Sequence, residues 1–105
     1  PMFDGAPEIV IQGITDSGET FRPSDWAERL SGMLSVFGED GHLAYSPFLK
    51  PIFAGGIHCV AVDRVLENRN PAAFEFLLQF ARDNRLMMRP GRKAQRPEDL
   101  PAAGA

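Results

Sequence analysis

The residue types most often used in catalysis or metal binding are few in this chain, and two of them are neighbours. His58 and Cys59 stand in the apolar segment 57–63. Adjacent strand residues point to opposite faces of a sheet, so this imidazole and this thiol cannot form a nucleophilic pair within a regular strand. We therefore expect Cys59 to be a small buried apolar residue and His58 to be a histidine whose hydrogen bonds are satisfied.

Metal and cofactor sites are not indicated. His42 can face His58 across a pair of strands, but two imidazoles without a third ligand do not make a zinc site. A single cysteine excludes both an internal disulfide and a zinc-finger spacing. The Gly55-Gly56 pair precedes a predicted strand, whereas a phosphate loop follows one. We expect no catalytic residue, cofactor or metal ion, and a small enzyme built around His42, Tyr45 and His58 is the least favoured hypothesis.

Charge is distributed unevenly along the chain. Residues 1–81 hold five basic and eleven acidic residues, whereas residues 82–97 hold six basic residues and one acid. A basic segment on an acidic body indicates either an anionic partner or a solvated end of the chain, and the second interpretation is favoured. A nucleic-acid accessory protein with a basic C-terminal arm is therefore an alternative, although the predicted central strand lacks aromatic residues for stacking bases. The candidate anion or nucleic-acid contacts are Arg22, Arg85, Arg89, Arg92, Lys93 and Arg96.

Two helices are predicted to position these residues. The first begins near Pro23, which suits a first turn, with oxygens of Ser24 and Asp25 available to the N-terminus. Its apolar residues recur at the helical period and predict a one-sided helix lying on a sheet. These residues are Trp26, Leu30, Met33, Leu34 and Phe37.

The second helix is the clearest element and spans residues 70–84. Asn70 and Pro71 open it, and Asn84 is expected to end it in a left-handed conformation. Its apolar surface covers about 200° of arc, which is more than one packing contact needs. The excess is available to the first helix, to the long loop before residue 57, or to a second subunit.

Four strands accompany the helices. Segments 8–14 and 57–63 are rich in β-branched residues and bounded by turns, so they read as strands. Segments 42–45 and 86–89 are predicted as shorter strands. Residues 46–56 carry Pro47 and Pro51, and proline removes ladder donors, so this segment is expected to be a loop or a broken edge and not a central strand.

The order of these elements, β-α-β-β-α-β, predicts a ferredoxin-like α+β sandwich: a four-stranded antiparallel sheet with two helices on one face. A single domain is expected over residues 8–89, with a loose lead-in at 1–7 and a disordered basic, Pro- and Ala-containing tail at 90–105. No membrane helix or signal peptide is indicated, and the single cysteine fits a cytoplasmic protein.

Neither face of the strand at 57–62 carries a charged residue, which favours cover on both faces. Together with the broad helix surface, this favours a non-catalytic binding or regulatory module that acts by protein–protein association, with itself as a homodimer or with another protein. The candidate interaction surface is Phe48, Phe53, Phe76 and Phe80.

A family resemblance rests on three stretches. They are Phe21-Arg22-Pro23-Ser24-Asp25-Trp26-Ala27-Glu28-Arg29-Leu30, then Tyr45-Ser46-Pro47, and then Phe76-Leu77 followed by Phe80-Ala81, Asn84 and Leu86. The chain resembles, over roughly residues 8 to 90, a small proteobacterial family known only as a domain of unknown function. The resemblance implies a bacterial, cytoplasmic protein and supplies no activity, ligand or catalytic residue.

Overall fold

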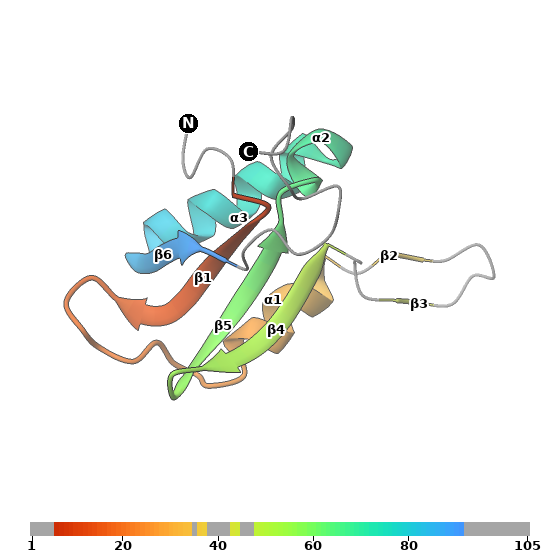
Figure 1. Cartoon of the computed structure of the whole chain (residues 1–105). Helices are drawn as coiled ribbons and strands as arrows, with labels where there is room; N and C mark the ends of the chain where they lie inside the picture. The colour runs from red at the N-terminus through yellow and green to blue at the C-terminus, as the bar shows by residue number, and fades with distance from the viewer. Residues whose placement is uncertain (1–5, 35, 38–42, 45–47, 92–105) are drawn as a thin grey trace.

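A computed structural model describes residues 6–34, 36–37, 43–44 and 48–91. Four strands form one antiparallel sheet in the order β4-β5-β1-β6, and two short strands form a separate pair (Figure 1). The elements in chain order are β1 (Glu8–Thr15), α1 (Trp26–Met33), β2 (Val36–Phe37), β3 (Leu43–Ala44), β4 (Leu49–Ala54), β5 (Ile57–Asp63), α2 (Leu66–Arg69), α3 (Pro71–Asp83) and β6 (Leu86–Pro90).

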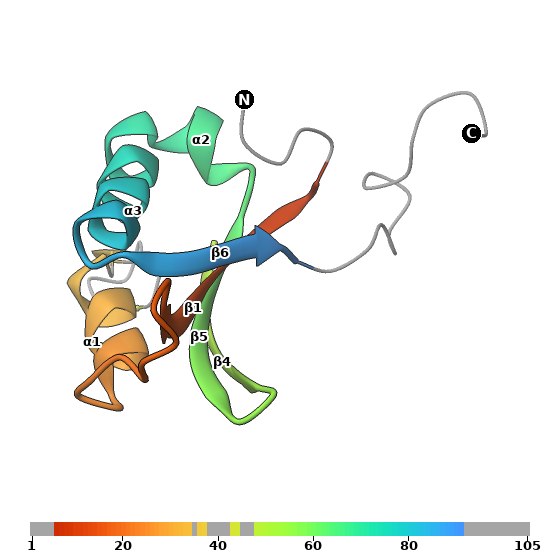
Figure 2. The same ribbon diagram turned by 90° about the vertical axis from the view of Figure 1, so that its left-hand side faces the viewer.

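The helices α1 and α3 cover the same face of the sheet (Figure 2). Without α2 and the β2–β3 pair, the order of the remaining elements is β-α-β-β-α-β, and the sheet order is that of a ferredoxin-like sandwich. The predicted fold class is confirmed. The additions are α2, which lies between β5 and α3, and the β2–β3 pair, which lies between α1 and β4.

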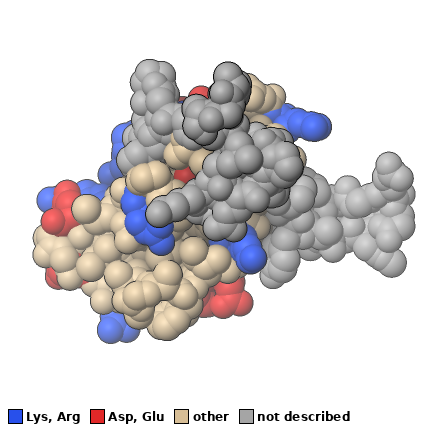
Figure 3. All heavy atoms as spheres, viewed as in Figure 1, with Lys and Arg blue, Asp and Glu red and all other residues tan. Residues whose placement is uncertain are grey.

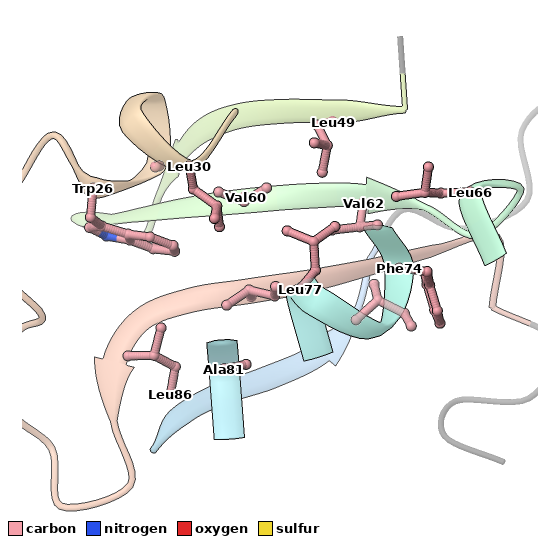
Figure 4. Packing of buried hydrophobic residues seen from close by; sticks show 13 residues of the cluster. Trp26, Leu30, Leu49, Val60, Val62, Leu66, Phe74, Leu77, Ala81 and Leu86 are labelled. Atoms are coloured by element: carbon pink, nitrogen blue, oxygen red, sulfur yellow. The ribbon is translucent and has the colours of Figure 1, made fainter. Parts of the chain in front are cut away.

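Alternation along the strands divides the apolar residues between the two faces of the sheet. On the helix side, Ile11 lies opposite Val60 and Ile9 opposite Val62, and all four are at most 2% exposed. Figure 4 shows side chains of the helices and strands meeting in this layer. The main core cluster consists of Ile9, Ile11, Trp26, Ala27, Leu30, Leu49, Val60, Val62, Leu66, Phe74, Leu77, Ala81 and Leu86.

The other face carries a smaller cluster of Val10, Cys59 and Ala61, against which Ile52 and Ile57 pack. Cys59 is buried, and its thiol donates to the carbonyl of Ile57 at 3.5 Å. The expectation that Cys59 is a small apolar residue facing away from His58 agrees with this arrangement. Residues 59–62 are all buried, so both faces of β5 are covered, as its sequence predicts.

The sequence misplaced the second strand of the main sheet. Residues 43–44 of the predicted strand form β3, which pairs with β2, whereas the predicted loop contains β4. The Phe48 carbonyl accepts from the N–H of Asp63 at 2.8 Å, and the alternation of an antiparallel ladder then turns the backbone N of Pro51 away from β5. Proline therefore interrupts no hydrogen bond of the sheet, because β4 is an edge strand.

The opposite edge strand, β6, also has a proline whose backbone N faces away from the sheet. Gly91 donates its N–H to the carbonyl of Glu8 at 2.8 Å, so the preceding residue, Pro90, which lies opposite Ile9, turns its backbone N away from β1. Each edge of the sheet thus presents a proline where an added strand would need a donor.

The first helix is shorter than predicted. It begins at Trp26 and ends at Met33, and Phe37 belongs to β2. Pro23 precedes the helix instead of occupying its first turn, and the Asp25 side chain makes no capping bond; its carboxylate accepts from Arg29 Nε at 2.8 Å. The apolar residues keep the helical period beyond Met33, but the helix ends there because the chain turns. Periodicity does not detect that turn.

The second predicted helix corresponds to α3, and its start is confirmed. The Asn70 side chain accepts from the N–H of Ala73 at 3.1 Å, and Pro71 occupies the first turn. The predicted end is wrong in one respect: Asn84 has φ −100°, and the left-handed residue is Arg85, with φ 58°.

Helix α1 approaches the sheet closely at Gly13. A Cβ atom there would overlap the carbonyl oxygen of His58 and lie 2.8 Å from Nε1 of Trp26. The indole of Trp26, which is 4% exposed, therefore packs directly on the backbone of β1. Only a residue without a side chain permits this contact.

We expect Gly13→Ala to lower the free energy of unfolding by roughly 1–3 kcal/mol, because the added methyl forces the strand pair or the indole to move. Urea titration measures the loss. The chain has one tryptophan, so its emission reports the same site and should shift to the red.

Gly18→Ala is the matched control. Gly18 has φ 88° and no atom within 4 Å of a Cβ, so this change strains the backbone locally and leaves the indole in place. A Gly13→Ala protein with wild-type stability and wild-type emission would contradict the close packing.

Candidate functional site

Helix α1 separates two hollows on the helix side of the sheet. Its buried residues Trp26, Ala27 and Leu30 face the strands. On the flank toward α3 lies an apolar groove of about 190 Å³, and on the flank toward β4 lies a more polar pocket of about 330 Å³. Arg29 lines the groove and Glu28 lines the pocket, so adjacent residues of opposite charge serve the two sites.

The α1–α3 groove is built on three aromatic rings. Trp26 and Phe80 stack with centroids 6.0 Å apart at 15°, and Phe21 meets both rings edge-on, at 5.4 and 6.0 Å. Such geometries stabilise aromatic clusters beyond their buried area. The groove is lined by Phe21, Pro23, Trp26, Arg29, Leu30, Met33 and Phe80.

The segment before α1 is held over the sheet by backbone bonds. Phe21 donates its N–H to the carbonyl of Gly13 at 3.0 Å, and Ile14 forms a bridge with Thr20. The chain therefore folds back beside the end of β1 and places Phe21 against Trp26. This return fixes one wall of the groove.

Large apolar side chains stand exposed beside the groove. Met33 is 68% exposed and lines the groove, while Phe76 is 40% exposed and lies one helical turn before Phe80 on the same flank of α3. Of the described residues that line the groove, only Arg29 is ionisable, and it is paired with Asp25 at 2.8 Å. The groove is therefore an apolar surface whose charged residue already has a partner.

The second hollow, the β4 pocket, mixes polar and aromatic groups. The Phe53 ring lies 4.7 Å from the His58 ring at 57°, and Phe53 is 64% exposed. The carboxylate of Glu28 and the hydroxyl of Ser24 come from α1 and the turn before it. The pocket is lined by Ser24, Ala27, Glu28, Pro51, Ile52, Phe53 and His58.

The structure does not gather the four predicted interaction residues on one surface. Phe80 belongs to the groove and Phe76 lies beside it, whereas Phe53 lines the β4 pocket on the far flank of α1. Phe48 is half-buried and packs against the main core. The sequence indicated an apolar excess on α3, and Phe76 is where that excess reaches solvent.

The predicted cationic contacts also lie apart. Arg22 is exposed before α1, and Arg89 is in β6, where its Nη1 donates to the carbonyl of Pro90 at 3.3 Å. Arg85 pairs with Asp16 at 3.1 Å and joins the α3–β6 turn to the loop after β1. On the described part of the face in Figure 3, basic and acidic groups are interspersed. Arg92, Lys93 and Arg96 lie outside the described residues.

Two of the three residues of the enzyme hypothesis, His42 and Tyr45, lie outside the described residues. His58 is exposed, and its described neighbours in the pocket include Glu28 and Ser24. Within the described ranges, no three side chains of His, Cys, Asp or Glu converge on a metal position. No helix there is long and apolar enough to cross a bilayer.

Sequence reasoning missed Met33 and Glu28 as surface residues of interest. Met33 fits the apolar period of α1, which predicts a buried side chain, and Glu28 lies outside that apolar stripe, which predicts an exposed one. The position of each relative to a hollow depends on which element lies beside α1. Nothing in the periodicity indicates that either residue borders a hollow.

The comparisons with known proteins agree on one family. Residues 6–91 match the model of a family described as "Protein of unknown function (DUF3579)". A solved structure, described as a solution structure and the first structural representative of its family, is 46% identical in sequence and superposes with a TM-score of 0.75. The match covers 81% of this chain and 79% of that chain. No match is found among curated proteins.

The left-handed backbone at Arg85 yields a prediction that separates its structural role from its charge. Arg85→Gly and Arg85→Ala both remove the pair with Asp16. The glycine variant should have the higher free energy of unfolding, by roughly 0.5–1 kcal/mol, because φ 58° penalises a Cβ.

The control is the two variants Arg89→Gly and Arg89→Ala, since Arg89 lies within β6 and is not among the positive-φ residues. There the order should reverse, with alanine more stable than glycine. Urea titrations of the four variants decide the matter, and equal stabilities of the two Arg85 variants would refute the role of the backbone.

Proposed function

Because the chain belongs to this family of unknown function, whose model spans nearly all of the described residues, we propose a function from the surface itself. The protein is a non-catalytic binding module that acts by protein–protein association, and the α1–α3 groove is its contact surface. The observation that carries this proposal is the exposure of Met33 and Phe76 around a hollow floored by Trp26 and Phe80.

An apolar groove with exposed methionine and phenylalanine is the kind of surface that associating proteins bury. Methionine adapts to an irregular partner surface, and aromatic side chains supply large contact areas. At 68%, Met33 is more exposed than any other large hydrophobic residue among those described. Its side chain buries little apolar surface in the single chain, so we expect it to bury apolar surface when the protein associates.

The edges of the sheet do not favour association. Pro51 and Pro90 occupy outward-facing positions on β4 and β6, so an added strand would lack a donor at both edges. Association is therefore expected to use side-chain surfaces rather than strand pairing. Among the described surfaces, the groove combines a hollow with exposed large apolar residues.

A second copy of this chain is the proposed occupant. The lining of the groove carries no net charge, because Arg29 is paired with Asp25, so two copies can bring it together without like-charge repulsion. In a two-fold dimer the same patch of each copy contacts the other. The projecting Met33 of one copy can then enter the hollow of its partner, and the reverse. The proposed assembly is a homodimer across the α1–α3 grooves.

Met33→Glu tests this directly. Placing a carboxylate in an apolar contact should weaken the dimer by at least about tenfold, because the charge loses water without gaining a partner. Sedimentation velocity from micromolar to submillimolar protein measures the monomer–dimer equilibrium. Phe76→Glu should act in the same direction.

Met87→Glu is the matched control. Met87 is 44% exposed and lies on β6, away from the groove, so the substitution adds the same charge elsewhere. This variant should dimerise like the wild type. A wild-type protein that stays monomeric across the range, or a Met87→Glu variant that dissociates as Met33→Glu does, would refute the proposal.

A further inference from the structure

The β4 pocket lies on the opposite flank of α1 from the groove, and the proposed dimer makes no use of it. It has a volume of about 330 Å³, and its lining residues come from α1 and its preceding turn, from β4 and from β5. Three separate elements therefore define it. Four of its side chains carry distinct chemistry: Ser24, Glu28, Phe53 and His58.

Among the described residues of this lining, Glu28 is the only acidic or basic one besides His58. The ion pairs found among the described residues join Arg29 to Asp25, and others elsewhere, but none includes Glu28. An exposed carboxylate in a helix commonly finds a cation three or four residues away, but position 32 on this helix is a glycine and position 31 a serine. The pocket thus contains a negative charge that no described cation neutralises.

Phe53 adds a second feature that favours a cation. Its ring is 64% exposed and forms part of the pocket wall, with the His58 ring 4.7 Å away. The face of an aromatic ring attracts a cation within about 6 Å of its centroid. Pro51 shares the helix-side face of β4 with Phe53 and can contact an aliphatic stem, whereas the Ile52 side chain packs on the other face of the sheet. A carboxylate, a ring face and an apolar wall are complementary to an alkylammonium group.

We propose that the β4 pocket binds a primary alkylammonium group, with Glu28 as the counter-ion, Phe53 as the ring beneath the cation, and Pro51 against its stem. Ser24 offers a hydroxyl acceptor to the ammonium. The group comes either from a free aliphatic amine or from a lysine side chain of another protein. Both sources present the same chemistry to the pocket.

Backbone amide shifts in ¹⁵N NMR titrations test this on the full chain. Butylammonium should shift amides of residues 24–28, 52–53 and 58 in a saturable manner. Butanol has the same stem without the charge and butyrate has the opposite charge, so both should give little or no shift there. Equal shifts with butanol would overturn the proposal, because the hollow would then be merely apolar.

Two variants assign the roles. Glu28→Gln should weaken butylammonium binding by about two- to fivefold or more, and Phe53→Leu by about two- to fivefold, as expected for an exposed ion pair and an exposed cation–π contact. Glu75→Gln, an exposed helix carboxylate paired with Arg82, should leave the affinity unchanged. Wild-type affinity in Glu28→Gln would overturn the assignment.

A comparison of putrescine with a capped tripeptide that has a central lysine distinguishes the two sources. Tighter binding of putrescine identifies a free amine as the natural ligand class, and tighter binding of the tripeptide identifies a lysine side chain of a partner. Failure of butylammonium, putrescine and the tripeptide to shift the pocket amides would overturn the proposal. The dimer variant Met33→Glu should bind butylammonium normally, which separates this site from the groove.

Discussion

The contact between Trp26 and Gly13 is the constraint on which the arrangement of the helix side depends. The indole lies on the backbone of β1, beside the carbonyl of His58, and no side chain can be added at residue 13 without displacing it. Its buried Nε1 has no hydrogen-bond partner among the described residues, so packing and not hydrogen bonding holds the ring there. This contact fixes where the first turn of α1 lies on the sheet.

The placement of α1 produces two sites of opposite character. One flank of the helix meets α3 through Phe80 and forms the apolar groove, with Arg29 at its wall. The other flank meets β4 and β5 and forms the polar pocket, with Glu28 at its wall. The proposed association through the groove and the proposed ammonium binding in the pocket are therefore separable, because they use different faces of one short helix.

The sheet restricts how the protein can associate. Antiparallel edges expose backbone donors and acceptors, and such edges readily accept another strand. Here Pro51 and Pro90 stand where those donors would face outward, on the two outer strands. Pro51, which misled the strand prediction, thus has a physical role at one edge, as Pro90 has at the other, and the proposed association is left to side-chain surfaces.

The sequence by itself determined the elements whose pattern is long and local. The cap and proline at the start of α3 and the β-branched runs of β1 and β5 each specify their own conformation, and together they imply the ferredoxin-like order. Family membership followed from short motifs in the same way. Local pattern is sufficient there because backbone hydrogen bonds and burial within each element agree.

Only the tertiary structure decided the position of β4, the end of α1, and the surfaces on its two flanks. Pro51 forbids a central strand but permits an edge, and the choice depends on which strand lies beside β5. Met33 lies at one edge of the apolar stripe and Glu28 lies outside it, and whether each borders a hollow depends on how far α3 and β4 extend around the helix. These outcomes arise from contacts between residues distant in sequence, which periodicity does not encode.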